Sequence, residues 1–255
     1  MTLTAAPELE TAAVAVARSA ADLVREAVGH GAALRTKSSS TDVVTPTDLR
    51  SEELIRNELE RLVPGSSFVG EELPEHDAGG EVEWVIDPID GTVNFLYDLP
   101  VVAVSIGARV AGAVVAGAVV DVLRRETYSA ALGQGARRDG APVRVNAVAD
   151  LSEALVATGY SYRATVREQQ AVVASRVLPR ARDVRSMGSA ALQLCWVGCG
   201  RIDAYYERDI KPWDGAAGLL IAREAGATAE DPDDSNDDLT VAAAPGIFDA
   251  LRSLL

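Results

Sequence analysis

The spacing of apolar residues predicts two helices near the start of the chain. Over residues 8–28, Ala, Val and Leu recur at helical intervals, and two glycines follow as stop signals. A second helix is predicted over residues 49–62, beginning at Thr47 or Asp48 and ending before a proline and a glycine. The polar, turn-rich segment between the two helices contains a short strand-like DVV at residues 42–44.

The central third of the chain has the pattern of β-strands. Two apolar runs that end in acidic residues, at 66–72 and 83–87, each predict a strand. Glycine-interrupted runs rich in Val and Ala follow at 101–110, 111–122 and 125–130, and they predict consecutive strands of an antiparallel sheet. The glycine-rich stretch after them has the composition of turns.

The second half of the chain alternates between strand-like and helix-like segments. The predicted elements are strands 154–159, 182–186, 202–207, 227–230 and 239–244, and helices 166–177, 189–197, 216–225 and one from Pro245. Two β-containing halves of this kind predict a mixed α/β (α+β) fold. We therefore expect an N-terminal half (1–145), with the long helices, the large antiparallel sheet and most candidate metal ligands. A C-terminal α/β half (146–255) is expected to join it in one compact unit.

The composition fits a globular protein with an aliphatic core. Hydrophobic residues make up 48% of the 255 residues and aromatic residues only 5%, so Val, Leu, Ile and Ala must fill the core. The net charge of −14 argues against a nucleic-acid-binding surface or an anionic membrane surface, because these need clustered Lys and Arg. An anionic substrate stays compatible with this charge, since bound cations can reverse the local field.

Neither the N-terminus nor any later segment predicts a membrane span. The start MTLTAAPELE lacks a basic region, and no apolar run is long enough to cross a bilayer. Cys195 and Cys199 lie in one apolar run, and they predict packed side chains on a helix face and not a disulfide framework. A cytoplasmic protein is therefore expected.

The available side chains exclude several kinds of catalytic site. With only His30 and His76, neither a histidine-rich zinc site nor a Ser-His-Asp triad is expected. The segments GQGARRD and GCGRID lack the third glycine of a dinucleotide fingerprint, and no GxxxxGKS/T phosphate loop occurs. Carboxylates remain as the candidate reactive groups.

The segment WVIDPIDGTVNF, residues 84–95, places two carboxylates on either side of a proline. The proline holds Asp87 extended at the end of an apolar strand, and Asp90 lies just beyond, where the chain turns. Gly91 allows close backbone approach, and with Thr92 it offers N–H groups suited to a phosphate. Hard carboxylate oxygens suit Mg²⁺. The alternative is a strand–turn–helix junction in which Asp90 is an N-cap and Asp87 forms an Asx turn.

Two further acids favour the metal interpretation. Glu71 lies at the end of another predicted strand, and Asp214 begins an Ala/Gly-rich helix; alone, they would be an exposed acid and a helix N-cap. Gathered with Asp87 and Asp90, they would repel one another unless cations lie among them. Two Mg²⁺ ions about 3.5–4 Å apart would relieve this repulsion and bind the attacking and leaving oxygens of a phosphate ester.

Three motifs, GEE, WVIDPIDGTVNF and KPWDGAAG, occur in an order and at separations that resemble the inositol monophosphatase family. The similarity covers nearly the whole chain, from TKSSSTDVVTPTD to the last of these motifs. The resemblance implies a layered αβαβα sandwich, usually a homodimer, within the Mg²⁺-dependent, lithium-sensitive phosphatase superfamily. It also implies two or three Mg²⁺ per active site and direct attack of metal-activated water on a phosphate monoester.

The resemblance assigns site residues motif by motif. The implied metal ligands are Glu71, Asp87, the carbonyl of Ile89, Asp90 and Asp214. The implied catalytic residues are Asp48 and Thr92, which orient and deprotonate the attacking water, together with Glu71 and Lys37. The implied substrate-binding residues are Asp90, Gly91, Thr92, Ala190, Glu207 and Asp214. Without the resemblance, Lys37 would be a solvated turn residue and Glu207 a surface acid.

The alcohol half of the substrate is left open by the sequence. Lys211, Asp209 and Arg208 depart from the pattern of animal inositol phosphatases on the sugar-facing side. Inositol 1-phosphate is the favoured substrate, with histidinol phosphate, fructose 1,6-bisphosphate and a 3′-phosphonucleotide as alternatives. A non-catalytic binding or regulatory protein is an alternative of another class, because some relatives are thought to act in transcription. The intact set of acids and Thr92 opposes it.

Overall fold

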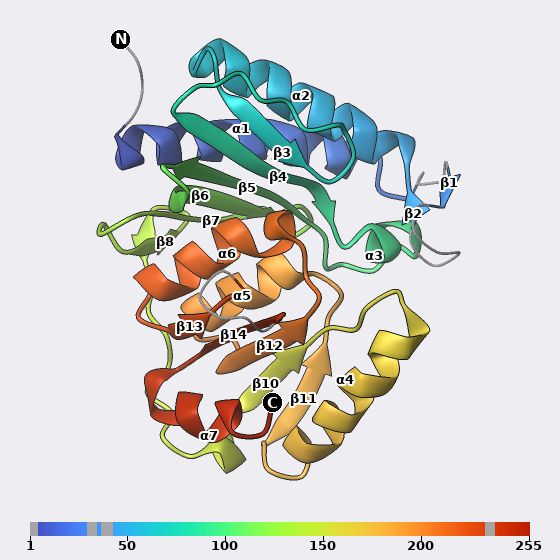
Figure 1. Ribbon diagram of the computed structural model, residues 1–255, viewed down its shortest axis with the longest axis vertical. Helices are drawn as coiled ribbons and strands as arrows, with labels where there is room; N and C mark the ends of the chain where they lie inside the picture. Colours follow the sequence, from blue (N-terminus) through green and yellow to red (C-terminus); the bar gives the residue numbers. More distant parts are fainter. Residues whose placement is uncertain (1–4, 30–34, 37–42, 233–237) are drawn as a thin grey trace.

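Two large β-sheets separate three layers of helices in the computed structural model, which describes residues 5–29, 35–36, 43–232 and 238–255 (Figure 1). The helices of the three layers, in order, are α1 (Ala6–Glu26) with α2 (Pro46–Leu62), α5 (Ala190–Gly198) with α6 (Pro212–Glu224), and α4 (Ala164–Val177) with α7 (Phe248–Arg252). The expected α/β fold, a layered αβαβα sandwich, is thereby confirmed.

The first sheet has seven strands in the order β3-β4-β5-β6-β7-β8-β9, with β3 parallel to β4 and every other pair antiparallel. The strands are β3 (Ser67–Gly70), β4 (Val82–Asp90), β5 (Ala103–Val110), β6 (Ala113–Asp121), β7 (Glu126–Ala131), β8 (Ala136–Arg138) and β9 (Ala141–Pro142). The predicted consecutive antiparallel strands are confirmed. The stretch predicted as turns contains β8 and β9, which are too short to show an alternating pattern.

Alternation along the strands divides this sheet between two cores. Val104, Ile106 and Ala108 of β5 pack in the core beneath α1 and α2, whereas Ala103 belongs to the core between the sheets. On β6, Val119 likewise belongs to the core between the sheets. Because successive side chains of a strand point to opposite faces, one strand supplies apolar side chains to both helical layers.

The second sheet has five strands in the order β11-β10-β12-β14-β13, with β10 parallel to both of its neighbours. The strands are β10 (Leu155–Thr158), β11 (Asp183–Ser186), β12 (Ala204–Arg208), β13 (Thr228–Glu230) and β14 (Leu239–Ala243). A third core on its outer face includes side chains of α4 and α7. The helix expected from Pro245 begins as the 3₁₀ turn Pro245–Ile247 and continues as α7.

Small residues allow α6 to lie close against the seven-stranded sheet. A Cβ on Gly117 of β6 would lie 2.9 Å from the Cβ of Ala217, and one on Gly107 of β5 would lie 3.1 Å from that of Ala216. Helix α6 starts at Pro212, four residues before the predicted start, because Asp214 accepts a hydrogen bond from the Lys211 N–H and caps it. This packing fixes the N-terminus of α6 beside the end of β4.

Two further features bear on the sequence expectations. Cys195 is buried in α5 and Cys199 follows that helix, and both thiols are free. In the part of the chain that the structure describes, no helix is both long and apolar enough to cross a membrane.

Candidate active site

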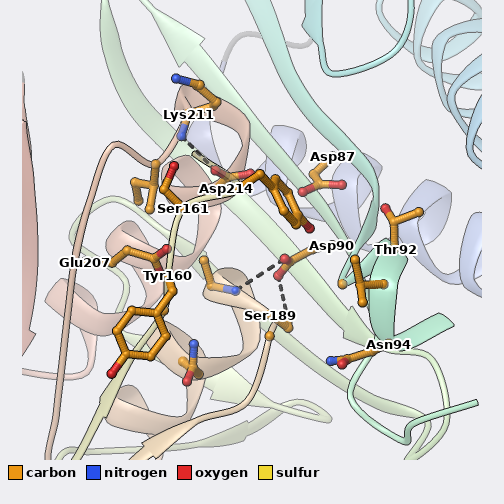
Figure 2. Close-up of a pocket in the computed structure, with 18 of the residues that line it drawn as sticks. Asp87, Asp90, Thr92, Asn94, Tyr160, Ser161, Ser189, Glu207, Lys211 and Asp214 are labelled. Atoms are coloured by element: carbon orange, nitrogen blue, oxygen red, sulfur yellow. Dashed lines mark hydrogen bonds between the residues drawn. The ribbon is translucent and has the colours of Figure 1, made fainter. Parts of the chain in front are cut away.

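A cavity of about 720 Å³ is lined by the end of β4, by β12 and by the N-termini of α5 and α6. Figure 2 shows Asp87, Asp90 and Thr92 on one side of it, Glu207 on the other and Asp214 between them. The predicted site residues that line it are Glu71, Asp87, Ile89, Asp90, Gly91, Thr92, Ala190, Glu207 and Asp214. Segments far apart in the sequence are therefore brought to one cavity.

The end of β4 explains how Asp87 and Asp90 come to the cavity. The strand does not end at residue 87 as predicted; it continues to Asp90, and its pairing with β5 shifts register between the two aspartates. The Ile89 N–H donates to Asp87 Oδ1 at 3.1 Å, which is the Asx turn of the alternative interpretation. The irregularity breaks the strict alternation of a strand and lets both carboxylates line the same cavity.

Gly91 makes the turn that follows. Its φ is +97°, and a Cβ there would lie 2.8 Å from the carbonyl oxygen of Val101, so only glycine fits. Gly91 is also the N-cap of the short helix α3 (Thr92–Leu96), so the alternative in which Asp90 caps this helix is wrong.

Thr92 and Asp48 form a hydrogen-bonded pair beside the cavity. The Thr92 hydroxyl lies 3.2 Å from Asp48 Oδ1 and 3.0 Å from the carbonyl oxygen of Ile89, and it can donate to either. Asp48 is fully buried, and its other oxygen accepts hydrogen bonds from the hydroxyl and the N–H of Thr45. Thr45, and not Thr47 or Asp48, is the N-cap of α2, with Asp48 completing the capping box.

Asp90 is held by the first turn of α5. It accepts hydrogen bonds from the Ser189 hydroxyl and from the N–H groups of Ala190 (3.3 Å) and Ala191 (2.8 Å). Burial raises the pKa of Asp90 to about 6, and the nearby Glu71 adds to the rise against the lowering effect of these hydrogen bonds. Asp90 is therefore fixed in orientation but costly to ionise without a cation.

Asp214 lines the same cavity, and neighbouring acids also affect its pKa. Burial raises its pKa well above the usual range, and the charges of Asp90, Glu71 and Glu207 raise it further. Asp90, Glu71 and Glu207 therefore all disfavour the ionised form of Asp214.

Glu207 lies on the opposite wall of the cavity, at the end of β12. Its carboxylate accepts a hydrogen bond of 2.7 Å from the Tyr205 hydroxyl, and burial, with Asp90 and Asp209 nearby, raises its pKa to about 7. Gly159 leaves room for this carboxylate, because a Cβ there would lie 1.9 Å from Glu207 Oε2.

The rim next to Glu207 carries two cationic side chains. Arg163 and Lys211 pair with Asp209 at 2.6 Å and 3.3 Å, and all three line the cavity. Burial opposes the ionisation of Asp209, but the two cations outweigh it and lower the pKa of this carboxyl. The rim therefore has one positive charge in excess.

The acids of the cavity fit a divalent cation. Their oxygens are hard donors, and burial together with neighbouring acids raises the pKa of Asp90 and of Asp214, so a bound cation would favour the ionised form of both. Among the described residues, no three His, Cys, Asp or Glu side chains are already gathered as a ready-made metal group. An open donor set of this kind suits Mg²⁺, which keeps several of its waters when it binds.

Some site residues were missed from the sequence, and one lies outside the described residues. Lys37 falls in the undescribed range 37–42. Ser189, Thr45 and Asn94 were missed; Asn94 donates from its side chain to the carbonyls of Val101 and Met187, both at 2.8 Å. Ser189, Thr45 and Asn94 each hold a segment of the site in place through a hydrogen bond. The only local signal for them in the sequence was the preference of Ser and Thr for N-cap positions.

Comparisons with known proteins agree on one family. A model of the Inositol monophosphatase family matches residues 6–252. An inositol-1-monophosphatase of Mycobacterium bovis is 49% identical over 240 residues, covering 88% of this chain and 81% of the relative. A Nus factor SuhB of Pasteurella multocida is 38% identical over 242 residues, covering 92% and 91%. The solved structure of Mycobacterium tuberculosis SuhB has a TM-score of 0.86 at 46% identity, covering 99% of this chain and 97% of that chain. The chain therefore belongs to the inositol monophosphatase family of metal-dependent phosphatases.

Proposed function

We propose that this phosphatase hydrolyses inositol 1-phosphate, with two or three Mg²⁺ ions held by Glu71, Asp87, the Ile89 carbonyl, Asp90 and Asp214. The observation that carries the proposal is that these four acids line one cavity beside the Thr92–Asp48 pair, and that burial and neighbouring acids raise the pKa of Asp90 and of Asp214. The similarity to inositol-1-monophosphatases supports the choice of substrate. From the resemblance of its motifs and from its net charge of −14, we also propose a cytoplasmic homodimer that binds neither nucleic acid nor membranes.

The residues of β4 and α3 would carry the hydrolysis itself. When bound, Mg²⁺ would supply positive charge for the phosphate and lower the pKa of a water. The Thr92 hydroxyl donates a hydrogen bond to Asp48. A lone pair on the same hydroxyl oxygen is then free to accept a hydrogen bond from the attacking water. The N–H groups of Gly91 and Thr92 would hold the phosphate. Attack is direct, so no side chain forms a covalent bond to phosphorus.

The opposite wall would select the alcohol. Glu207 is placed to accept hydrogen bonds from hydroxyl groups, next to Ala190 of α5. When Glu207 is ionised, it and Asp209 balance the charges of Arg163 and Lys211, so the net charge of this wall does not select between a neutral and a cationic alcohol. The choice of inositol 1-phosphate over histidinol phosphate rests on the similarity to inositol-1-monophosphatases.

The deciding experiment is a comparison of kcat/KM with Mg²⁺ on inositol 1-phosphate, histidinol phosphate, fructose 1,6-bisphosphate and a 3′-phosphonucleotide. We expect inositol 1-phosphate to be preferred by about a hundredfold, equivalent to about 2.7 kcal/mol in transition-state binding. A different preferred substrate would keep the metal assignment and overturn the choice of alcohol. No turnover of any of the four would favour a binding protein, the alternative to which the name of the Nus factor SuhB relatives also points.

A substitution tests the metal assignment. Asp90→Asn should reduce Mg²⁺-dependent phosphate release by at least about a hundredfold, because it removes the charge that two ions would share. Asp249→Asn, an exposed site on α7 in the outer layer, serves as the matched control and should retain full activity. Retained activity in Asp90→Asn would contradict the metal assignment.

A further inference from the structure

A buried ion pair on α2 holds the segment that carries Glu71. Glu52 is fully buried, and its oxygen Oε1 accepts from Arg56 Nε at 2.9 Å and from Arg56 Nη2 at 2.6 Å. An ionised pair this deep in a protein is costly unless the remaining hydrogen-bonding positions of both groups are used. Here the main chain of the segment directly after β3 forms hydrogen bonds with these remaining positions.

Both partners of the pair bind the main chain that follows Glu71. Glu52 Oε2 accepts from the Glu72 N–H at 2.8 Å, and Oε1 accepts from the Leu73 N–H at 3.3 Å. Arg56 donates to the carbonyl oxygens of Leu73 at 3.0 Å and of Pro74 at 2.8 Å. The pair therefore forms hydrogen bonds with both the N–H groups and the carbonyl oxygens of this segment.

The main chain of Glu71 is fixed from the other side as well. Its N–H donates to the carbonyl oxygen of Ile86 at 3.2 Å, one residue before Asp87 on β4. Three successive N–H groups, those of residues 71 to 73, thus have fixed partners, the first on β4 and the next two on Glu52. A side chain at the preceding residue, Gly70, would displace Glu52, because a Cβ there would lie 2.1 Å from Glu52 Oε1.

We propose that Glu52, with Arg56, is a positioning residue that sets the place of Glu71 for divalent cation binding. The inference rests on the proposed role of Glu71 as a metal ligand and adds a residue that does not itself touch the metal. Helix α2 also holds Asp48 beside Thr92, and its Ser51 donates to the carbonyl oxygen of Pro88 at 3.0 Å. The first two turns of one helix therefore contact the site at three points, two in residues 84–95 and one in the segment after β3.

The test compares Glu52→Gln with Glu58→Gln. Glu58 is a matched control because it lies on the same helix and pairs with an arginine, Arg61, at 2.7 Å, but both side chains are exposed. Glutamine at 52 must direct its amide group at one of the N–H donors that the carboxylate accepts. We expect the Kd for Mg²⁺, measured by titration calorimetry, to rise about tenfold in Glu52→Gln and to stay unchanged in Glu58→Gln.

A second measurement separates positioning from general stability. Hydrogen exchange of the Glu72 and Leu73 amides should accelerate in Glu52→Gln, while amides of β5 exchange as before. At saturating Mg²⁺, KM for inositol 1-phosphate should return to the unaltered value. Should Glu52→Gln not fold, Arg56→Lys carries the test, because it keeps the charge beside Glu52 and removes donors to Leu73 and Pro74.

The outcomes distinguish this inference from the proposed function. A Kd for Mg²⁺ within twofold of the unaltered protein in the folded variants, or unchanged exchange at Glu72 and Leu73, would overturn the role of Glu52. Absence of Mg²⁺ binding by the unaltered protein would instead overturn the metal site itself, and the positioning role with it.

Discussion

Ser189 joins two functions in one side chain. Its buried hydroxyl donates to Asp90 and accepts from the Leu192 N–H at 3.3 Å as the N-cap of α5. Ser189→Ala should lower the free energy of unfolding by about 1 kcal/mol through the lost cap and weaken Mg²⁺ binding through a less firmly held Asp90. Urea denaturation and calorimetry measure the two effects.

Ser175 provides the control for this substitution. It is an exposed serine whose hydroxyl donates to the Val172 carbonyl within its own helix, α4. Ser175→Ala should change the free energy of unfolding by no more than about 0.5 kcal/mol. Equal Mg²⁺ affinity in Ser189→Ala and the unaltered protein would show that Ala190 and Ala191 suffice to hold Asp90.

Sequence could indicate the acids of this site but not the residues that hold them. Asp87 and Asp90 stand out because a proline lies between them and a glycine follows, and Glu71 and Asp214 stand out because one ends a predicted strand and the other begins a predicted helix. Glu52 and Arg56 have the spacing of an ordinary helix pair, and the main-chain partners of Glu52 lie 20 and 21 residues away and become neighbours only through the fold. Roles that depend on tertiary contacts can be assigned only from the three-dimensional structure.

At the scale of elements, the close approach of α6 to the seven-stranded sheet predicts how one added methyl group would change stability and activity. Gly117→Ala would place a Cβ 2.9 Å from the Cβ and 3.0 Å from the Cα of Ala217. Backbone cannot yield as a flexible side chain does, so α6 and its Asp214 must shift. We expect a loss of about 1–3 kcal/mol in the free energy of unfolding and a lower kcat/KM.

A double variant checks that the shift of α6 is the cause. Ala217→Gly removes the Cβ that Gly117→Ala would meet, at a cost of about 1 kcal/mol in helix propensity. The double variant should therefore be more stable than the sum of the two single effects predicts. Strict additivity in urea denaturation would contradict the proposed clash.

Element prediction succeeded where periodicity was long and failed where ends depend on capping. Helix α1 was expected within two residues of its observed ends because many turns share one apolar face. Helix α6 was expected to begin at residue 216, since the proline and the capping aspartate before it resemble a loop when read alone. β4 passes through Pro88, a residue that normally ends a central strand.

For the whole molecule, the buried acids couple stability to pH and to divalent cations. In the metal-free protein, the raised pKa of Asp90 (about 6) means that folding favours its protonated form. Its contribution to stability is thus present below the unfolded pKa near 4 and is lost as the pH rises through about 6. On the proposed metal assignment, Mg²⁺ would bind the ionised form, so it should restore stability at neutral and higher pH.

Thermal unfolding with and without Mg²⁺ measures this coupling. At pH 8 and a Mg²⁺ concentration about a hundred times Kd, binding adds about 2.7 kcal/mol, or about 5–10 °C in Tm for a chain of this size. At pH 5.5 the increase should shrink because protons compete for Asp90 and Asp214. Equal increases at both pH values would contradict the proton competition, and Asp90→Asn should weaken the dependence on pH.

The layered architecture could be inferred from the resemblance, but the order of the strands within the second sheet could not. The order β11-β10-β12-β14-β13 brings the end of β12 to the cavity, although this order follows no rule of sequence adjacency. The division of the chain at residue 145 stays a prediction.

The cavity draws its two walls from the two sheets, and this has a consequence for how such a protein can change. Asp87, Asp90 and Thr92 come from β4 and α3, whereas Tyr160, Glu207 and Lys211 come from segments flanking the second sheet (Figure 2). On the roles proposed above, the reactive groups other than Asp214 and the groups that select the alcohol are encoded in separate stretches of the gene. Libraries randomised only at residues 159–163 and 207–211 would therefore explore new alcohols while the machinery that cleaves the ester is left untouched.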